Sequence, residues 1–298
     1  MRTQKRFTPD LLDRFKRLGR GTGTYEEYVP WHRVGRSDPG SLGRSHLMMW
    51  RKRQRELLSD GEMSGALFMT MLNNLADAVE QFPLAEEDGV HELARYDIRH
   101  THTRVPGTIS ISRRLNIRHP RVNGNGRSRR WCLTTDQLLV LKLADGTLEM
   151  LAVSFKPAGL RLTKRAYQLL ALEQAYWAAR SVQWILITPE LFDETAADCL
   201  WRAAPWALGD TVDPHTIELA AAIVSECLGY SLTFTLDSLS SVLGNLDFAQ
   251  RAFWQGVWSG AIPMDLRRGW RPHLPVNLID TQCFLDLNPI ARRRSAWI

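Results

Sequence analysis

The stretch from Cys132 to Ala158 constrains the fold of this chain more than any other. It reads CLTTDQLLVLKLADGTLEMLAVSFKPA, two apolar segments joined at Asp145-Gly146. An Asp-Gly pair between apolar runs is typical of a β-hairpin, because both residues tolerate the positive φ of a tight turn. The sequence therefore predicts two adjacent antiparallel strands, an arrangement found in many classes of protein.

Two charged residues mark the open end of this hairpin. Asp136 stands near the start of the first strand, and Lys156 ends the second strand just before Pro157. A carboxylate that holds a divalent cation, with a lysine near the attacking water, is the framework of a metal-dependent nuclease site. A lysine at a strand end is also typical of a solvated edge, so the hairpin alone leaves both interpretations open.

The length of the turn decides whether these two side chains share a face. A two-residue turn at Asp145-Gly146 pairs Asp136 with Phe155 and puts Lys156 on the other face. A three-residue loop, residues 145–147, pairs position 136 with position 156. We therefore expect that loop, or a bulge, if both residues serve one site.

The composition is that of an ordinary globular protein of one large or two ordinary domains, with 298 residues of which 44% are hydrophobic. We see no apolar run long enough to span a membrane and no signal-peptide core. The four cysteines lie far apart without zinc-ligand spacing. We expect a cytoplasmic protein that associates with the nucleoid when it is bound to DNA.

Charge is segregated along the chain. The net charge is +7 over residues 1–60, −6 over 61–100, +8 over 101–131, +1 over 132–190 and −4 over 191–298. Basic segments of this kind suit a polyanionic partner, although a solvated basic loop explains residues 101–131 equally well. The candidate DNA-binding residues are Arg51, Arg53, Arg127, Arg129 and Arg130.

Two helices are predicted before the hairpin. Residues 8–18 form the first, with Thr8 as its cap and Pro9 at its first position. The second starts near Ser59, where Ser59 and Glu62 have capping-box spacing. Glu62 is therefore a helix cap, a metal ligand, or both. The apolar positions expected to continue this helix are Met63, Leu67, Met71, Leu75 and Val79.

A helix over residues 164–180 and a buried strand over residues 183–188 follow the hairpin. Hairpin, helix and strand in this order predict an α/β fold with a mixed sheet flanked by helices, as in restriction-type nucleases. Glu173 lies in the middle of the predicted helix, near its buried side.

From about residue 191 the pattern changes to helices over 216–228, 236–243 and 246–258, followed by a predicted β-hairpin or wing that begins at Ser259. This order is that of a winged helix. Because this part is acidic, contact with a protein is favoured over major-groove binding. The alternative is DNA binding through a local basic face, Arg267, Arg268 and Arg271. The basic, aromatic tail supplies the candidate partner-binding residues Arg292, Arg293, Arg294 and Trp297.

Several separated motifs agree with one family. They are GRG-x-G with Y-V-P-W (19–31), GRSH (43–46), LLSD-x-E (57–62), EQFPL (80–84), TD-x-LV (135–140), KPA (156–158) and LE-x-x-YW (172–177). In this order they resemble the TnsA family, the endonuclease subunits of heteromeric Tn7-like transposons, including CRISPR-associated ones. The resemblance covers roughly residues 15–190 with specific motifs and is only architectural beyond them.

The resemblance implies a restriction-endonuclease-like domain over 1–190 and a winged-helix-like domain over 191–298 that contacts a regulator. It implies Mg²⁺-dependent cleavage of double-stranded DNA at the 5′ ends of a transposon, with Mn²⁺ as a substitute. The partners would be a TnsB-like transposase and a TnsC-like AAA+ regulator. Glu62, Asp136 and Lys156 match the family's catalytic residues, and Glu173 matches a further family glutamate.

Two departures from the family pattern stand out. Nuclease sites of this type carry an acidic residue two positions before the lysine, whereas this chain has Ser154. Glu62 would supply the missing carboxylate, and the backbone carbonyl of Phe155 would complete the oxygen ligands of the metal. The basic segment 101–131 is also longer than the family pattern.

Two other functions remain open from the sequence. One is a stand-alone restriction or repair endonuclease, which the acidic C-terminal part disfavours because such an enzyme binds DNA unaided. The other is a non-catalytic assembly factor of a transposition complex, which the presence of all three polar site residues disfavours.

Overall fold

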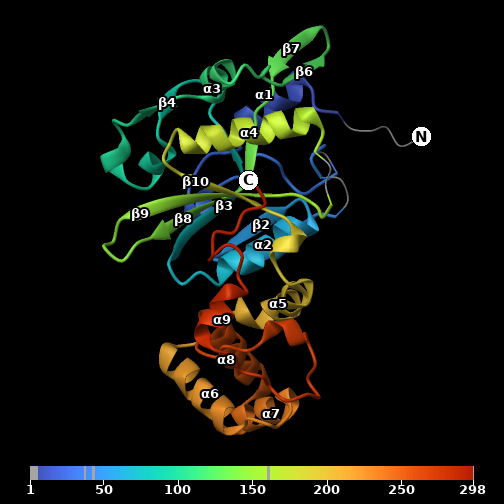
Figure 1. The fold of residues 1–298 in the computed structure, drawn as a ribbon, viewed down its shortest axis with the longest axis vertical. Helices are drawn as coiled ribbons and strands as arrows, with labels where there is room; N and C mark the ends of the chain where they lie inside the picture. Colours follow the sequence, from blue (N-terminus) through green and yellow to red (C-terminus); the bar gives the residue numbers. More distant parts are fainter. Residues whose placement is uncertain (1–5, 37, 42–43, 160–161, 298) are drawn as a thin grey trace, which may run out of the picture. The chain divides into compact units, whose positions relative to one another are not determined.

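The computed structural model describes residues 6–36, 38–41, 44–159 and 162–297. These residues form two compact units along the chain shown in Figure 1. The first unit takes the residues up to Met63, those from Asn74 to Leu186, and Trp297. The second takes Ser64–Asn73 and Ile187–Ala296. Helix α2, Asp60–Thr70, begins in the first unit and ends in the second.

A four-stranded sheet with the order β10-β9-β8-β3 is the centre of the first unit. Strand β8, Thr134–Lys142, pairs antiparallel with both β9, Leu148–Phe155, and β3, Leu75–Pro83. Helix α4, Lys164–Ala178, connects β9 to β10, Gln183–Ile187, as the crossover between parallel neighbours requires. The predicted mixed sheet flanked by helices is therefore confirmed.

Alternation along the strands decides which side chains meet α4. In a strand every second side chain points to the same face. Figure 1 shows α4 on one side of the sheet and strand β2, Arg53–Leu57, on the other. The buried cluster between the sheet and α4 includes Leu138, Val140, Met150, Ala152, Leu172, Tyr176 and Trp177.

The predicted length of helix α2 is wrong. The helix ends at Thr70, and Leu75 and Val79, expected to continue it, lie in strand β3. The amides of Met71 and Leu72 donate to carbonyls three residues back, which closes the last turn before Asn73-Asn74. Local periodicity missed this change because β3 is stabilised by pairing with β8, which lies far along the chain.

The remaining elements of the first unit are short. The predicted first helix is confirmed as α1, Pro9–Arg17, and Thr8 Oγ1 accepts the amide of Leu11 at 3.2 Å. The others are β1 (His46–Trp50), β2 (Arg53–Leu57), β4 (Gly89–Val90), β5 (Arg104–Val105), α3 (Thr108–Arg114), β6 (Arg121–Gly124) and β7 (Arg127–Arg130). The basic segment 101–131 thus includes a helix and a hairpin of its own.

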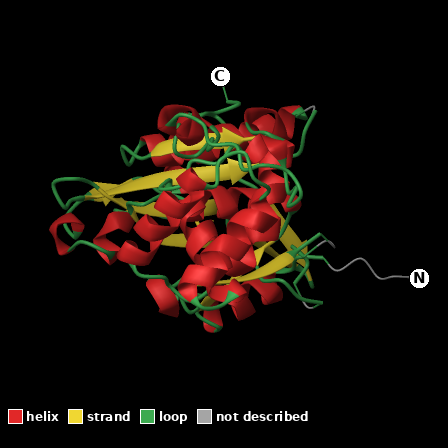
Figure 2. Ribbon diagram, turned by 90° about the horizontal axis from the view of Figure 1, so that it is seen from below, coloured by secondary structure: helices red, strands yellow, loops and turns green. Residues whose placement is uncertain are grey.

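The second unit is helical. Figure 2 colours helices red and strands yellow. All strands of the described chain begin in the first unit. Besides the end of α2, the helices are α5 (Glu194–Ala207), α6 (Pro214–Glu226), α7 (Leu232–Leu243), α8 (Leu246–Ser259) and α9 (Thr281–Asp286). Helices α6, α7 and α8 confirm the three helices predicted there.

The hairpin predicted to begin at Ser259 is absent from the described residues. Met264 instead forms an isolated bridge with Leu278, and Leu266–Arg268 is a 3₁₀ turn. Pro263 has no amide to donate to a strand ladder, which explains why pairing does not extend there. No helix of the described residues is both long and apolar enough to cross a membrane.

Candidate active site

The open end of the β8–β9 hairpin brings Asp136 and Lys156 close together. Neither predicted turn is formed, because the last pair is Lys142 with Leu148 and residues 143–147 make a longer loop. The register pairs Gln137 with Val153. Asp136 lies one residue before this pair, and Ser154 and Lys156 lie one and three residues after it, so the two charged residues meet just beyond the paired part of the hairpin.

Hydrogen bonds hold Asp136 against the end of β9. The amide of Phe155 donates to Asp136 Oδ2 at 2.8 Å. Lys156 Nζ lies 3.9 Å from the same oxygen and donates to the Phe155 carbonyl at 2.8 Å. The carboxylate and the amine are both half-buried, so each remains accessible to solvent.

Glu62 lies in the first turn of α2, where its buried carboxylate is held by three donors. Oε2 accepts the amide of Leu58 at 2.9 Å and Gln81 Nε2 at 2.9 Å. Oε1 accepts the hydroxyl of Ser59 at 3.1 Å, and Ser59 Oγ accepts the amide of Glu62 at 3.2 Å. The predicted cap is therefore confirmed.

Capping does not explain the electrostatics of Glu62. Burial, together with the negative charge of Asp136, raises the pKa of Glu62 to about 8. A cap exposed to water has no such shift, because the helix N-terminus favours the anion. Each of the two carboxylates opposes the ionisation of the other, and a bound divalent cation would offset this repulsion.

Glu173 lies behind the two strands rather than among the accessible groups. Its Oε1 accepts from the hydroxyls of Thr135 at 2.7 Å and Ser154 at 2.6 Å, and from Trp184 Nε1 at 3.1 Å. Burial and the charge of Asp136 raise the pKa of Glu173 to about 7. This glutamate thus ties β8 to β9 beside Asp136, and Ser154, which replaces the expected acid, is its hydrogen-bond donor.

The groups that could bind a metal here are oxygen donors. Across the described ranges, no three or more His, Cys, Asp or Glu side chains cluster in a way that would hold a metal ion. The candidate ligands are therefore Glu62 and Asp136, while the Phe155 carbonyl already accepts from Lys156. Gln137 Oε1 is a buried oxygen for which the described part of the chain shows no partner. Such a set fits a hard cation such as Mg²⁺.

The two predicted DNA-binding arginines of the first hairpin have different environments. Arg53 was expected on an exposed basic face, and that expectation is wrong. It is 7% exposed, and both of its terminal nitrogens donate to Glu80 at 2.7 Å. Alternation along β2 turns it inward, toward β3. Arg51 is exposed and donates to the carbonyls of Leu75 and Ala76 at 2.8 and 2.7 Å.

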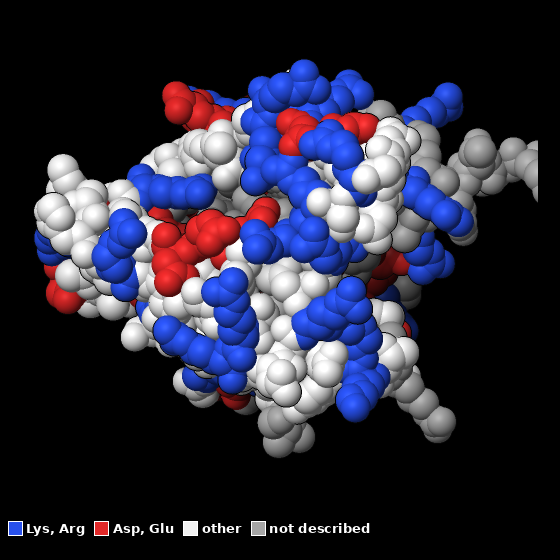
Figure 3. Space-filling model, turned by 90° about the horizontal axis from the view of Figure 1, so that it is seen from above, with Lys and Arg blue, Asp and Glu red and all other residues white. Residues whose placement is uncertain are grey.

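The other three predicted DNA-binding arginines lie on the hairpin of β6 and β7, and each has an acidic partner. Arg127 pairs with Asp10 at 2.7 Å and with Asp13 at 3.1 Å, and Arg129 also pairs with Asp13. Arg130 lies 3.5 Å from Glu87. Figure 3 shows Lys and Arg side chains spread over the face of the molecule seen from above, with Asp and Glu among them.

The predicted partner-binding tail is anchored within the protein. Trp297 stacks on Tyr167 with ring centroids 4.7 Å apart, and its Nε1 donates to Gln174 at 3.0 Å. Arg292 pairs with Asp286, and Arg294 donates to the carbonyl of that residue at 2.8 Å. Arg293 is half-buried and has positive φ. A partner role for these residues stays a prediction.

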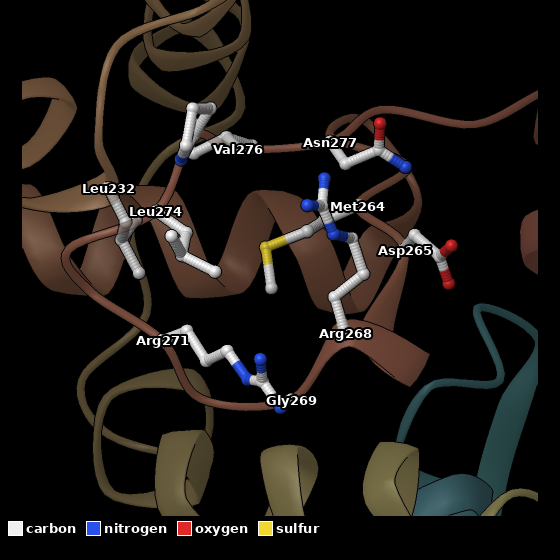
Figure 4. Close-up of a pocket in the computed structure, with 10 residues that line it drawn as sticks. Leu232, Met264, Asp265, Arg268, Gly269, Arg271, Leu274, Val276 and Asn277 are labelled. Carbon is white, nitrogen blue, oxygen red and sulfur yellow. The ribbon is translucent and has the colours of Figure 1, made fainter.

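The second unit has a small pocket, shown in Figure 4. Leu232, Met264 and Leu274 give it an apolar part, and the exposed side chains of Arg268 and Arg271 lie at its rim. Arg267, the third member of the predicted local basic face, is paired with Asp265 at 2.7 Å. The pocket has no carboxylate arrangement like that around Asp136.

Sequence reasoning missed two glutamines at the site. Gln81 donates to the Glu62 carboxylate, and Gln137 donates to the Glu62 backbone carbonyl at 3.1 Å. Gln81 lies in the EQFPL motif and Gln137 follows Asp136 directly. Their positions in those motifs were the only signal, since neither amide titrates or has a characteristic spacing.

Comparison with known proteins gives one relative to report. Over 172 residues the chain is 31% identical to the Transposon Tn7 transposition protein TnsA of Escherichia coli. The alignment covers 57% of this chain and 53% of the relative, so the chain spans about half the length of the curated protein it matches. No protein-family model matches the chain.

Proposed function

This chain is related to the TnsA family, and from that relationship we propose that it is the endonuclease subunit of a heteromeric, Tn7-like transposon. It would cut double-stranded DNA at the 5′ ends of the element. A TnsB-like transposase would act on the other strand, and a TnsC-like AAA+ regulator would control the reaction.

One observation carries this proposal. Lys156 Nζ lies 3.9 Å from Asp136 Oδ2 at the end of β8 and β9, and burial together with the charge of Asp136 raises the pKa of Glu62. Two carboxylates that can hold a metal ion, with a lysine beside them, are a set of groups that supports metal-assisted hydrolysis of a phosphodiester. The order hairpin, α4, β10 supports a restriction-endonuclease-like fold, and helices α6 to α8 support a winged-helix-like second unit.

The residues divide the chemistry among them. Glu62 and Asp136 would hold Mg²⁺, or Mn²⁺ in its place, with the Phe155 carbonyl as a further oxygen. When bound, the metal supplies charge for the phosphate and lowers the pKa of water. Lys156 would orient the attacking water and stabilise negative charge on the phosphate. Glu173 would keep β8 and β9 in register beneath these groups.

Strand-specific cleavage tests the proposal. With the transposase and a transposon-end duplex present, Asp136→Ala should abolish 5′-strand cleavage and leave assembly of the complex intact. Loss of one metal carboxylate costs several kcal/mol of transition-state stabilisation, which is on the order of 10² to 10³ in rate. Cleavage at the wild-type rate would contradict the site assignment. Absence of cleavage by the wild-type protein with Mg²⁺ would instead favour an assembly factor.

Cleavage without the transposase would favour a stand-alone nuclease. This outcome is tested by incubating the same transposon-end duplex with the wild-type chain alone, under the conditions used with the transposase. The proposed division of labour predicts that this reaction gives no specific cut at the transposon end.

A further inference from the structure

Gln81 has an unusual backbone conformation in β3, an edge strand of the four-stranded sheet, beside the candidate site. Strand β3 pairs Glu80 with Gln137 and Phe82 with Thr135, so Gln81 lies between these pairs, at the level of Asp136. Its φ is 50°, although it is neither glycine nor asparagine and is only 2% exposed. A buried residue keeps this uncommon conformation only where its surroundings fix it, and such residues cluster at functional sites.

The backbone at this position is held on its carbonyl side. The carbonyl of Gln81 accepts the amide of Trp31 at 3.3 Å and the hydroxyl of Tyr28 at 3.4 Å. The side chain of Gln81 contacts helix α2, where its Nε2 donates to Glu62 Oε2 at 2.9 Å. The conformation thus places an amide donor against a carboxylate that comes from a different element.

A count of hydrogen bonds shows what this donor does. A carboxylate offers about four acceptor positions, two on each oxygen. On Glu62, Oε2 accepts from Leu58 and Gln81, and Oε1 accepts from Ser59. The described contacts therefore fill both positions of Oε2 and leave one position, on Oε1.

We propose that Gln81 is a positioning residue that fixes the Glu62 carboxylate so that Oε1 is the oxygen presented to a divalent cation. The inference rests on the proposed function and deepens it, because it names the group that orients one of the two metal carboxylates. Groups that orient metal ligands by hydrogen bonds typically contribute 10- to 100-fold to metal affinity.

Gln137 is the internal comparison. It also contacts Glu62, but its Nε2 donates to the backbone carbonyl at 3.1 Å and does not touch the carboxylate. Gln137 therefore holds the first turn of α2 against β8, whereas Gln81 alone of the two glutamines acts on the side chain.

Two substitutions separate positioning from a structural role. Gln81→Asn keeps the amide, suits positive φ better than glutamine does, and is one methylene too short to reach Glu62. Gln81→Met keeps the length and removes the donor. Gln54→Asn, at an exposed position on β2, is the matched control.

The first measurement is the affinity of the full chain for Mn²⁺ in the absence of DNA, monitored by electron paramagnetic resonance. We expect both Gln81 variants to bind Mn²⁺ about 10- to 100-fold more weakly than wild type, and Gln54→Asn to bind normally. The unfolding temperature of Gln81→Asn should not fall. In cleavage assays kcat should drop, with KM for DNA unchanged.

Wild-type Mn²⁺ affinity in folded Gln81→Asn would overturn the inference while leaving the proposed function intact. Failure of the proposed metal site has a different signature: Glu62→Gln and Asp136→Asn would then bind Mn²⁺ as wild type does, which would overturn both. If Gln81→Met does not fold, the Mn²⁺ affinity of Gln81→Asn still tests the inference.

Discussion

Glu62 combines a helix cap with a buried charge, and one substitution separates the two. Burial raises its pKa from 4.5 to about 8, so between these values the folded state retains a proton that the unfolded state has lost. Stability of the metal-free protein should therefore decrease as the pH rises from about 4.5 to about 8. In Glu62→Gln, which still fills the capping position, this loss should shrink and cleavage should fall on the order of 10² to 10³-fold.

Thermal unfolding in EDTA at pH 5, 6.5 and 8 measures the effect. Glu173 has a raised pKa of about 7 and contributes with the same sign, so Glu173→Gln is the parallel variant. Mg²⁺ should restore wild-type stability most strongly at pH 8, since binding requires the carboxylate to release its proton. A Glu62→Gln protein that cuts DNA normally would show that Glu62 is only a cap.

Arg53 provides a second test at this scale. It is buried with Glu80, and removing one partner of a buried pair leaves an uncompensated charge. Arg53→Ala should therefore destabilise the protein by about 3 to 5 kcal/mol. Denaturant unfolding measures this loss, with exposed Gln54→Ala as the control. A stable Arg53→Ala protein with weakened DNA binding would restore the original assignment to DNA.

At the scale of elements, the hairpin of β6 and β7 is a basic arm whose charges are engaged by helix α1. Its arginines Arg127 and Arg129 pair with Asp10 and Asp13. The Arg127 side chain is exposed and that of Arg129 is half-buried, and exposed pairs contribute little to stability. We propose that these pairs exchange for contacts with phosphate, and that the arm therefore binds DNA despite these partners.

This arrangement predicts opposite effects on the two sides of the contact. Replacing Arg127, Arg129 and Arg130 by alanine should weaken DNA binding and flatten its salt dependence by about one unit of slope per lost phosphate contact. Replacing Asp10 and Asp13 by asparagine should strengthen binding. DNA affinities measured over a range of KCl concentrations test both predictions. If the slope of log affinity against log salt concentration is unchanged in both variants, the hairpin does not contact DNA.

At the scale of the whole molecule, the two units exchange short segments of chain. The second unit includes Ser64–Asn73, where Asn288 donates to the Phe68 carbonyl at 2.7 Å and Trp258 donates to Thr70 at 3.0 Å. The first unit includes Trp297, which packs on Tyr167. A cut between residues 190 and 191 therefore removes packing partners from both.

A fragment that ends at residue 190 should consequently unfold less cooperatively than the full chain and bind a hydrophobic dye, because buried Leu67 and Phe68 lose their cover. Full-length Trp297→Ala is the matched test of the tail alone, with an expected loss of about 1 to 3 kcal/mol. If the fragment unfolds as cooperatively as the full chain, the shared segments are unimportant. Recruitment of the regulator is then best tested with point variants of the intact chain, beginning with Arg292 and Arg294.

The sequence by itself determined the elements whose signals are local. The β8–β9 hairpin, helix α4 and the caps at Thr8 and Ser59 follow from apolar patterning and capping chemistry within a few residues. Asp136, Lys156 and Glu62 were candidates for the same reason, since charge at the end of an apolar segment is visible along the chain.

Only the tertiary structure decided what depends on distant pairing. The β3–β8 ladder ended α2 at Thr70 and made a strand of residues expected to be helical. The end of the β8–β9 ladder brought Lys156 Nζ to 3.9 Å from Asp136 Oδ2, and β2 turned Arg53 inward to Glu80. Gln81 became part of the site because its backbone conformation directs an amide at Glu62. Such contacts join residues far apart in the chain, and their free energy comes from burial and pairing that no local pattern records.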